Sequence, residues 1–331
     1  MAHGRFDNPI VAALAGFIDI FRKQKLSERL SDDECIEGKT CMVTGANSGL
    51  GYALGVDLAK RGGQTIMTCR RQLDETKSKA IKESGAKNLE VEYLDLSKIQ
   101  SIHDFVNKLD KEGVTLDIII LNAGVALPRA RKTESGLEEM FLVNYLSNYI
   151  LLQLLLKKGI LKPDPSGKKA PRVIFISSDS HQGSSHIDFE EFGNYFEYGV
   201  SKGMNYYSYY KLVLNTLAIE YGRRFDSDPL SISFNVICPG PVNSNIIKEA
   251  PWLLRVMLRG IFAIIFKSPK EAAKPVIYMA ISEDYAGKTG EYLHMFNQKR
   301  MDEKVYIEEE GTKLWQASER VWVEVDECEK L

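Results

Sequence analysis

Short apolar segments alternate with longer helical stretches from Lys39 to about Ala280, and this alternation constrains the fold more than any other feature of the sequence. Two of the apolar segments, Asp117–Leu121 and Arg172–Ser177, are apolar almost throughout. Strands of this kind are buried on both faces, and each is followed by a helix, which is typical of a parallel sheet covered on both sides. We therefore expect a single α/β domain with a Rossmann-like, doubly wound parallel sheet.

The expected elements follow one another along the chain. Strands are expected at Thr40–Thr44, Gln64–Cys69, Leu89–Leu94, Asp117–Leu121, Arg172–Ser177 and Leu230–Ile237. Helices are expected at Leu50–Arg61, Leu73–Ser84, Lys98–Lys111, Glu134–Lys158 and Asn205–Phe225. Residues 162–170 are rich in Pro, Gly and Lys, and we interpret them as a loop within the same domain because the alternation resumes after them.

Three regions result from this pattern. We expect an N-terminal amphipathic arm over residues 1–36, the α/β domain over 37–300, and an acidic C-terminal extension over 301–331 that is a solvated surface. The arm contains an apolar run, Ile10–Phe21, which is too short for a membrane span and has its basic residues after it. A helix packed on the domain or on a second subunit explains this run, and a helix lying on a membrane surface is the alternative.

Charge and cysteine content exclude several classes of protein. The chain has 43 Lys and Arg residues against 45 Asp and Glu residues, a formal charge of −2, which argues against a nucleic-acid partner. Its five cysteines are scattered and never in CxxC spacing, so we expect free thiols in a reducing compartment and no zinc or other metal site. These features predict an intracellular protein, either cytoplasmic or peripherally membrane-associated.

The first expected strand runs into a glycine-rich turn, Thr44–Gly51, that opens a helix. Such glycines permit a tight turn and a close approach of the backbone to a ligand, and the positive end of the helix suits a pyrophosphate. The GxxxGxG spacing differs from the general GxGxxG fingerprint, but its place between strand and helix predicts a dinucleotide site. The expected cofactor-binding residues are Gly45, Asn47, Ser48, Gly49, Leu50 and Gly51.

Two arginines follow the second strand, where a dinucleotide-binding fold selects between NAD and NADP. An acidic residue there bonds the ribose of NAD, whereas Arg70 and Arg71 suit the 2′-phosphate of NADP. We therefore expect NADP as the cofactor and NAD as the less favoured one; a surface arginine pair is the alternative. Asp95 and Leu96 follow the third strand, where Asp95 either bonds the adenine amino group or belongs to a turn before a helix capped by Ser97.

Further motifs at the expected strand ends make the chain resemble the short-chain dehydrogenase/reductase family. They are TGANSGLG at 44–51, Asn122-Ala123-Gly124, Asn144, Ser177-Ser178, a Tyr-x-x-x-Lys and Pro239-Gly240. The resemblance spans about Glu37 to Trp322 and is strongest to the retinol dehydrogenase group, which acts on apolar alcohols and carbonyls. It implies that the cofactor also contacts Asn122, Ala123, Gly124, Tyr207, Lys211, Pro239, Gly240, Val242 and Ser244.

The resemblance also implies a set of catalytic residues. Hydride transfer at a carbonyl carbon needs a proton transfer at the oxygen, which the resemblance assigns to Tyr207. A free tyrosine titrates at about 10, and the charge of Lys211, one helical turn away, favours the phenolate and lowers that pKa. Ser178 holds the substrate oxygen beside the tyrosine. By the same resemblance, Lys211 bonds the nicotinamide ribose and Asn144 anchors a water relay.

A second pair, Tyr198 and Lys202, has the same Tyr-x-x-x-Lys spacing. We favour Tyr207 and Lys211 because Asn205 can cap a helix that continues past Lys211. In addition, Lys202 is followed by glycine, a poor residue for a helix interior. The sequence after Lys211 also resembles the corresponding helix of the retinol dehydrogenases.

The residues around the expected catalytic serine have simpler interpretations. Ser178 matches the family's catalytic position and Ser177 is expected to finish the strand; a loop hydroxyl that bonds nearby backbone is the alternative for both. His181 and His186 follow closely, and we expect both at the surface without a catalytic role.

Two apolar segments bear on the substrate and on partners. The dense aromatic run from Phe189 to Tyr210 indicates an apolar pocket or, for most of the rings, a subunit interface of a homodimer or homotetramer. The apolar segment Pro251–Lys267 falls in the expected substrate loop, about residues 245–268. It could close over a lipid-like substrate, contact a membrane surface or form a buried helix.

These observations together predict an NAD(P)-dependent oxidoreductase that prefers NADP. Its expected substrate is an apolar alcohol and the matching aldehyde or ketone, such as a retinoid, a steroid or another lipid. A non-catalytic NADP-binding sensor or scaffold is one alternative, although such proteins tend to lose part of the Ser/Tyr/Lys set. A nucleotide-sugar epimerase is the other, although its glycine loop usually reads GxxGxxG.

Overall fold

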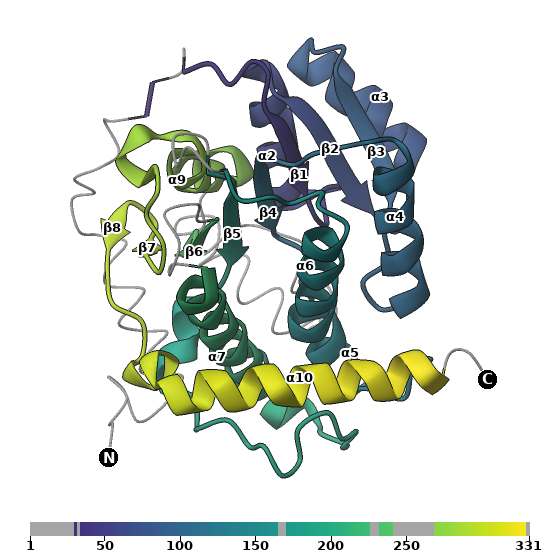
Figure 1. Ribbon diagram of the computed structural model, residues 1–331, viewed down its shortest axis with the longest axis vertical. Helices are drawn as coiled ribbons and strands as arrows, with labels where there is room; N and C mark the ends of the chain where they lie inside the picture. The colour runs from purple at the N-terminus through teal and green to yellow at the C-terminus, as the bar shows by residue number, and fades with distance from the viewer. Residues whose placement is uncertain (1–29, 32–33, 165–169, 226–231, 241–267, 329–331) are drawn as a thin grey trace.

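The computed structural model describes residues 30–31, 34–164, 170–225, 232–240 and 268–328. Within them, eight strands form one sheet in the order β3-β2-β1-β4-β5-β6-β7-β8, in which only β8 is antiparallel to its neighbour (Figure 1). The strands are β1 Thr40–Val43, β2 Gln64–Cys69, β3 Leu89–Tyr93, β4 Ile118–Leu121, β5 Arg172–Ile176, β6 Ser233–Cys238, β7 Tyr292–His294 and β8 Asn297–Gln298. The strand order reverses between β1 and β4, which is where open α/β sheets bind ligands.

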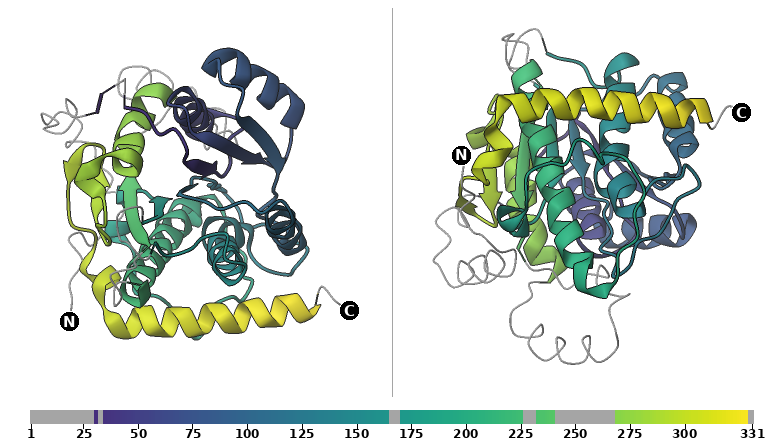
Figure 2. Two further views of the ribbon diagram at one scale, coloured as in Figure 1. Left: turned by 45° about the horizontal axis from the view of Figure 1, so that its top comes forward. Right: turned by 90° about the horizontal axis from the view of Figure 1, so that it is seen from below.

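Helices cover both faces of the sheet, so the expected doubly wound fold is confirmed (Figures 1 and 2). One face carries α2 (Gly49–Lys60), α3 (Leu73–Ser84) and α9 (Pro269–Ile281). The other carries α4 (Ile99–Lys111), α5 (Glu139–Phe141), α6 (Ser147–Lys157) and α7 (Val200–Phe225). Each face has its own hydrophobic core, and strand side chains alternate between the two. On β1, for example, Cys41 and Val43 join one core and Met42 joins the other.

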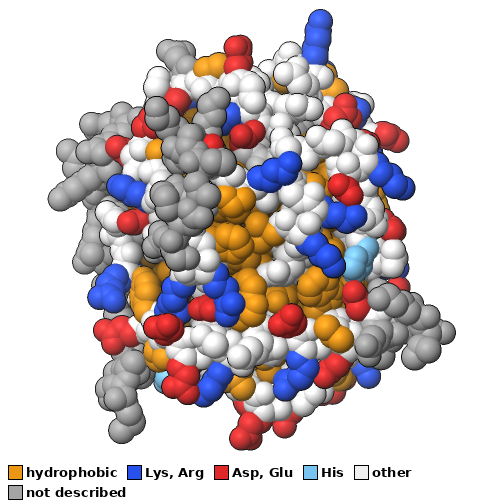
Figure 3. Space-filling view, in the orientation of Figure 1, with side chains coloured by type: hydrophobic (Ala, Val, Ile, Leu, Met, Phe, Trp, Pro, Cys, Tyr) orange, Lys and Arg blue, Asp and Glu red, His pale blue; other side chains and the backbone are white. Residues whose placement is uncertain are grey.

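The C-terminal extension folds back as α10 (Glu308–Cys328) across α6 and α7 (Figure 2). Its apolar side chains are buried in the same core as α7, and they include Leu314, Ala317, Val321 and Val325. Only the outer side of the extension is therefore the solvated acidic surface that we expected. Figure 3 shows this outer side lined with charged groups, below a group of apolar side chains in the middle of the face.

Helix α7 begins at Val200, earlier than the expected start at Asn205. Gly203 therefore lies inside the helix, and the argument that this glycine opposes a helix was wrong. A Cβ atom on Gly203 would lie 2.6 Å from the carbonyl oxygen of Leu127. The glycine allows the helix to pack against this neighbouring backbone, a tertiary reason that outweighs its low helix propensity.

The helix expected at Glu134–Lys158 begins later, at Glu139. The preceding residues form an isolated antiparallel bridge between Lys132 and Glu138. A π-helical turn, Leu142–Leu146, then joins α5 to α6. Among the described residues, the stretch Glu139–Lys157 is long and apolar enough to cross a membrane, but 89% of its tested window is buried inside the protein, as in a core helix.

Several expected features lie outside the described residues. They are the apolar run of the N-terminal arm, most of the substrate loop at about 245–268, and two of the expected cofactor-binding residues, Val242 and Ser244.

Candidate active site

Close backbone approaches shape the glycine turn after β1. Gly45 and Gly49 have φ angles of 66° and 60°, which residues with a side chain rarely adopt. A Cβ atom on Gly51 would lie 2.4 Å from Nδ2 of Asn122 and 2.5 Å from the carbonyl oxygen of Gly45. Each of the three glycines therefore has a geometric reason to be there.

Asn122, directly after β4, ties the glycine turn to the neighbouring strand. Its Nδ2 donates to the carbonyl oxygen of Thr44 at 2.8 Å. The hydroxyl of Thr44 accepts from the N–H groups of Asn122 and Ala123, each at 3.0 Å. The first turn of α2, behind the glycines, contains no acidic side chain. This helix start therefore fits a pyrophosphate, because it offers N–H groups and the positive end of the helix dipole.

Arg70 and Arg71 follow β2 at the same edge of the sheet and are exposed. Nη1 of Arg70 lies 3.8 Å from one oxygen of Glu139, and Nη1 of Arg131 lies 3.0 Å from the other. Glu139 is buried, whereas the side chains of Arg70 and Arg131 are 44% and 50% exposed. Arg70 and Arg71 therefore present positive charge to solvent at the edge of the sheet that carries the glycine turn, which suits a phosphate monoester.

Asp95 forms a turn with Ser97, and its expected contact with the adenine stays a prediction. Its Oδ1 accepts from the N–H of Ser97 at 3.0 Å and from the Ser97 hydroxyl at 2.7 Å. Ser97 does not cap the helix as expected, because α4 begins at Ile99 with Lys98 as its N-cap residue. The neighbouring residue, Leu96, is buried.

Asn144 and Lys211 meet next to Gly124, at the carboxyl ends of β4 and β5. Asn144 clamps the backbone of Val125, accepting from its N–H at 2.7 Å and donating to its carbonyl oxygen at 2.8 Å. Nζ of Lys211 donates to the carbonyl oxygen of Ile176 at 2.8 Å. A Cβ atom on Gly124 would lie 3.3 Å from Oδ1 of Asn144 and 3.8 Å from Nζ of Lys211. Glycine therefore keeps the space between these two side chains open.

Tyr207 lies one helical turn before Lys211, whose Nζ is 5.7 Å from the centre of the tyrosine ring. Burial raises the pKa of Tyr207 above its usual value. Burial also lowers the pKa of Lys211 to about 8. Burial thus acts in the opposite direction to the lowering that we expected from the lysine charge, and that lowering stays a prediction.

The alternative pair has a different environment. Tyr198 precedes α7, and its hydroxyl donates to Oε1 of Glu138 at 3.0 Å. Lys202 is exposed to solvent. Burial raises the pKa of the Glu138 carboxyl and also that of the Tyr198 phenol. Tyr198 thus joins a buried hydrogen bond with the start of α5, and Lys202 extends away from the protein core.

Ser178 begins a turn of 3-10 helix, Asp179–Gly183, directly after β5. Its hydroxyl accepts from the N–H of Ser180 at 3.4 Å and from the Ser180 hydroxyl at 3.0 Å. The N–H of Ser177 continues the ladder of the strand by donating to Ile237 at 2.7 Å, as expected. Ser178 is therefore the first residue beyond the hydrogen-bonded pairing of β5 with β6.

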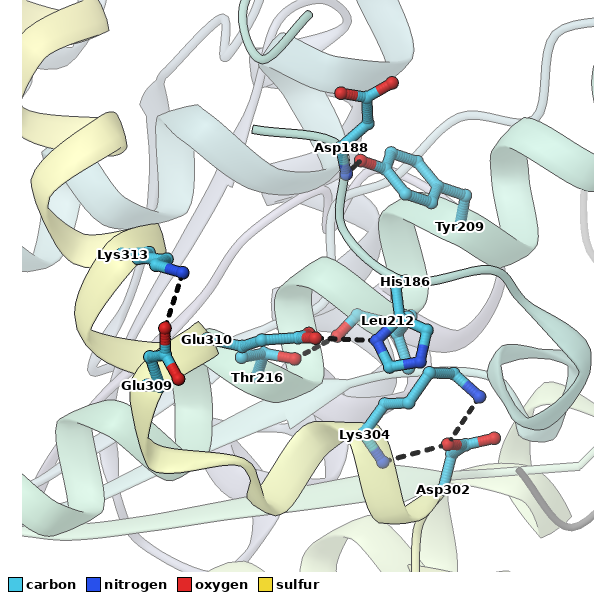
Figure 4. Close-up of polar contacts among 10 residues, drawn as sticks. All are labelled: His186, Asp188, Tyr209, Leu212, Thr216, Asp302, Lys304, Glu309, Glu310 and Lys313. Atoms are coloured by element: carbon cyan, nitrogen blue, oxygen red, sulfur yellow. Dashed lines mark hydrogen bonds and ion pairs between the residues drawn. The ribbon is translucent and has the colours of Figure 1, made fainter. Parts of the chain in front are cut away.

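The two histidines after this serine differ from each other. His186 is exposed, as expected, and its Nδ1 lies 2.6 Å from Oε1 of Glu310 at the start of α10 (Figure 4). His181 is fully buried, so the expectation of a surface position was wrong for it. Its ring bonds to a segment more than a hundred residues further along the chain, at Asp302, which no local pattern indicates.

The aromatic run between residues 189 and 210 packs largely within the chain. Phe192 meets the rings of Phe141 and Tyr145, with centroids 5.2 and 5.8 Å apart. Tyr206 stacks near Tyr198 with centroids 4.6 Å apart. Internal packing accounts for these three rings, and the subunit interface that we expected for most of the aromatic run stays a prediction.

Sequence reasoning missed the charged residues that surround the serine turn. Asp179 forms a buried ion pair with Lys299 at 2.7 Å, and Asp302 forms another with Lys304 at 2.8 Å. Neither pair belongs to a spacing motif. Apart from the apolar residues nearby, nothing in the sequence indicates that a charged residue beyond the expected domain boundary at residue 300 is buried.

The chain is similar to known proteins over most of its length. The sequence profile of the short chain dehydrogenase family matches residues 39–251. Mouse (Mus musculus) retinol dehydrogenase 13 is 33% identical, with 86% of this chain and 84% of that protein covered. Human (Homo sapiens) polyprenol dehydrogenase is 29% identical, with 85% and 84% covered.

Solved structures share the fold. The Pseudomonas aeruginosa RhlG/NADP active-site complex superposes with a TM-score of 0.59 at 22% identity, covering 80% of this chain and 98% of that chain. A short-chain dehydrogenase/reductase from Serratia marcescens BCRC 10948 gives 0.56 at 23% identity, covering 78% and 96%. The chain belongs to the short-chain dehydrogenase family of NAD(P)-binding oxidoreductases, and within it is retinol dehydrogenase-like.

Proposed function

We propose that this protein is an NADP-preferring oxidoreductase that interconverts an apolar alcohol and its aldehyde or ketone. The observation that carries the proposal is the meeting of Asn144 and Lys211 beside Gly124 at the carboxyl edge of the sheet, with the ring of Tyr207 centred 5.7 Å from the lysine Nζ. The competing tyrosine, Tyr198, is instead bonded to Glu138. Lys211 of the first pair thus lies beside Gly124, whereas Tyr198 of the second pair is held in the protein interior and Lys202 is exposed.

Each residue of the proposed site has one task. Tyr207 transfers the proton to or from the substrate oxygen, and Ser178 orients that oxygen by donating a hydrogen bond. The charge of Lys211 stabilises the phenolate while it exists, and Asn144 fixes the backbone beside it. When bound, the nicotinamide supplies or accepts the hydride. Because Lys211 is buried and Tyr207 partly buried, water screens their mutual electrostatic effect less than it would at the surface.

The proposed cofactor site follows the same edge of the sheet. The glycine turn at 45–51 and the start of α2 hold the pyrophosphate, and Arg70 and Arg71 hold the 2′-phosphate of NADP. Leu96 and the turn at Asp95 lie toward the adenine. The remaining proposed contacts are Asn122, Ala123, Gly124, Pro239, Gly240, Val242 and Ser244.

An apolar substrate is favoured by the relatives, which are named retinol and polyprenol dehydrogenases. The apolar composition of Pro251–Lys267 supports the same class, since this segment follows β6 and the proposed Pro239-Gly240 contact. We extend the proposal to peripheral contact with a membrane surface through this segment and the N-terminal arm, and to a homodimer or homotetramer.

The test is turnover by the purified full-length chain. NADPH or NADH is mixed with all-trans-retinal, a polyprenal, a steroid ketone and the polar control glyceraldehyde, and the loss of absorbance of the reduced cofactor is followed. We expect oxidation of NADPH with an apolar carbonyl, and at least about tenfold lower kcat/KM with NADH. Faster turnover of glyceraldehyde, or a preference for NADH, would contradict the proposal. Tight NADPH binding without turnover in either direction would indicate a sensor.

The arginines are tested by a matched pair of substitutions. Arg70→Gln removes a charge beside the glycine turn, and we expect it to raise the KM for NADPH about tenfold with little change for NADH. Arg320→Gln, on the exposed side of α10, is the control and should change neither. Equal effects of Arg70→Gln on the two cofactors would show that Arg70 does not bind the 2′-phosphate.

A further inference from the structure

The turn that carries Ser178 is held by side chains from near the end of the chain. Nδ1 of His181 lies 2.7 Å from the carbonyl oxygen of Ser178. Nε2 of the same ring accepts from the N–H of Asp302 at 3.2 Å. The ring is 0% exposed, and it meets Tyr292 of β7 in a T-shaped contact with centroids 5.6 Å apart. One buried imidazole thus bridges the serine turn and the C-terminal segment.

These two hydrogen bonds determine which nitrogen carries the proton. A carbonyl oxygen only accepts, so Nδ1 of His181 must donate to Ser178. A backbone N–H only donates, so Nε2 must accept from Asp302. The imidazole is therefore neutral, with its proton on Nδ1. Burial lowers the pKa of His181, which favours the same neutral form.

Buried ion pairs fix both ends of this bridge. Oδ2 of Asp179, the residue after Ser178, lies 2.7 Å from Nζ of Lys299, and its Oδ1 accepts from the Tyr292 hydroxyl at 3.0 Å. Although burial alone would raise it, His294 and Lys299 hold the pKa of the Asp179 carboxyl below its usual value. On the other side, Asp302 pairs with Lys304 (Figure 4). Because the charges of Asp179 and Lys299 would be costly to bury alone, this pair keeps the serine turn and the C-terminal segment in a fixed relative position, while the Asp302–Lys304 pair stabilises the segment itself.

The hydroxyl of Ser178 is oriented by the same turn. It accepts from both the N–H and the hydroxyl of Ser180, so its own proton is left to donate to another oxygen. The direction of that proton depends on the backbone at 178, whose carbonyl group is held by His181. A rotation of this peptide would move the Ser178 hydroxyl relative to Tyr207.

We propose that His181 is a positioning residue that links the backbone of Ser178 to that of Asp302, in the C-terminal extension, and so directs the serine hydroxyl toward the substrate oxygen. This inference rests on the proposed role of Ser178. Through this link, residues 299–304, which are distant from the glycine turn in the sequence, influence the reaction directly.

A double-mutant cycle separates positioning from general stability. The variants are Ser178→Ala, His181→Gln and the double substitution, assayed for kcat and KM with NADPH and all-trans-retinal. We expect about 100-fold lower kcat for Ser178→Ala and about tenfold lower kcat for His181→Gln. In the Ser178→Ala background, His181→Gln should change kcat less than about twofold, because no serine hydroxyl remains to be aimed.

The outcomes distinguish the inference from the proposed function. An equal effect of His181→Gln in both backgrounds would overturn the inference and leave the role of Ser178 intact. An unchanged kcat in Ser178→Ala would overturn both. NADPH affinity within about twofold of wild type shows that each variant keeps the cofactor site.

Two further measurements sharpen the result. His181→Asn can still donate to Ser178 but cannot reach Asp302, so we expect it to keep more kcat than His181→Gln; the reverse order would contradict the inference. His186→Gln, at the exposed histidine of Figure 4, is the matched control and should keep wild-type kcat. If the His181 variants do not fold, ¹⁵N NMR of the wild-type imidazoles decides. We expect a neutral ring protonated on Nδ1, and a proton on Nε2 would overturn the inference.

Discussion

Two turns lie at the carboxyl edge of the sheet, and they are held in opposite ways. The glycine turn after β1 is fixed by neutral hydrogen bonds, in which Asn122 and Thr44 join adjacent parallel strands. The serine turn after β5 is fixed by a buried imidazole and by the Asp179–Lys299 ion pair, whose partners are 120 residues apart in the sequence.

The difference shows what each turn needs. A turn that receives a diphosphate must keep its backbone N–H groups and positive helix end available, so glycines and neutral partners suit it. A turn that aims one hydroxyl needs rigidity, and buried charged partners supply this because breaking any one of them is costly. The glycine turn is therefore visible as a local sequence motif, whereas the serine turn depends on side chains that are distant in the sequence.

The largest effect should appear in the free energy of unfolding when the buried ion pair of the serine turn is broken, compared with breaking an exposed ion pair elsewhere in the protein. Lys299→Met leaves the Asp179 carboxylate without its lysine, and both side chains are at most 9% exposed. We expect a loss of about 3 to 5 kcal/mol in the free energy of unfolding, measured by urea denaturation. Lys98→Met breaks an exposed pair with Glu134 and should cost far less, because water already screens these charges. Equal losses would show that the serine turn does not depend on buried charge.

A smaller effect, on cofactor affinity, should follow from filling the glycine turn. In Gly51→Ala, the new Cβ would lie 2.4 Å from Nδ2 of Asn122, so the turn must shift. We expect NADPH affinity, measured by isothermal titration calorimetry, to fall about 30-fold, equivalent to roughly 2 kcal/mol. In the control Gly199→Ala, no atom of the described residues outside the immediate chain neighbours lies within 4 Å of the added Cβ, and affinity should not change. Wild-type affinity in Gly51→Ala would contradict the geometry of this turn.

The smallest effect should be a loss of stability at low pH that arises from His181 in the serine turn. Because the pKa of His181 is lowered in the folded state, the unfolded chain takes up the proton first as the pH falls. The contribution of His181 to the free energy of unfolding is therefore fully present above the pKa of the unfolded chain, about 6.5, and declines below it. Between pH 6.5 and 6.0 the loss is at most about 0.7 kcal/mol, the limit set by one proton.

The decline is measured by comparing unfolding curves of wild type and His181→Asn across this pH range. The difference between the two proteins should shrink as the pH falls, and the control His186→Gln should follow wild type. A constant difference would mean that folding does not shift the pKa of His181, and a difference that grows as the pH falls would mean that folding raises it, which the hydrogen bond from Asp302 opposes.

Much of the nucleotide-binding half could be predicted from the sequence, because its signals are local. The strand-glycine-helix order at 40–60 and the alternation of apolar strands with helices needed no knowledge of distant contacts. The start of α7 was misplaced because Gly203 is present for its contact with Leu127. The burial of His181 was missed for a similar reason, since its partners lie on β7 and beyond.

The C-terminal helix was within reach of sequence reasoning. Leu314, Ala317, Val321 and Val325 have the three- and four-residue spacing of a buried helix face, but the surrounding acidic residues dominated the interpretation. The choice of Tyr207 over Tyr198 stays a prediction, although the bond from Tyr198 to Glu138 supports it.

The most direct test of the central claim compares Tyr207→Phe with Tyr198→Phe in the NADPH and retinal assay. Each substitution removes one hydroxyl and keeps the ring. We expect Tyr207→Phe to lower kcat at least about 1000-fold, as loss of a general acid–base group does, while NADPH affinity stays within about threefold. Tyr198→Phe should keep kcat within about threefold and show only reduced stability. Activity that survives Tyr207→Phe and is lost in Tyr198→Phe would contradict the claim.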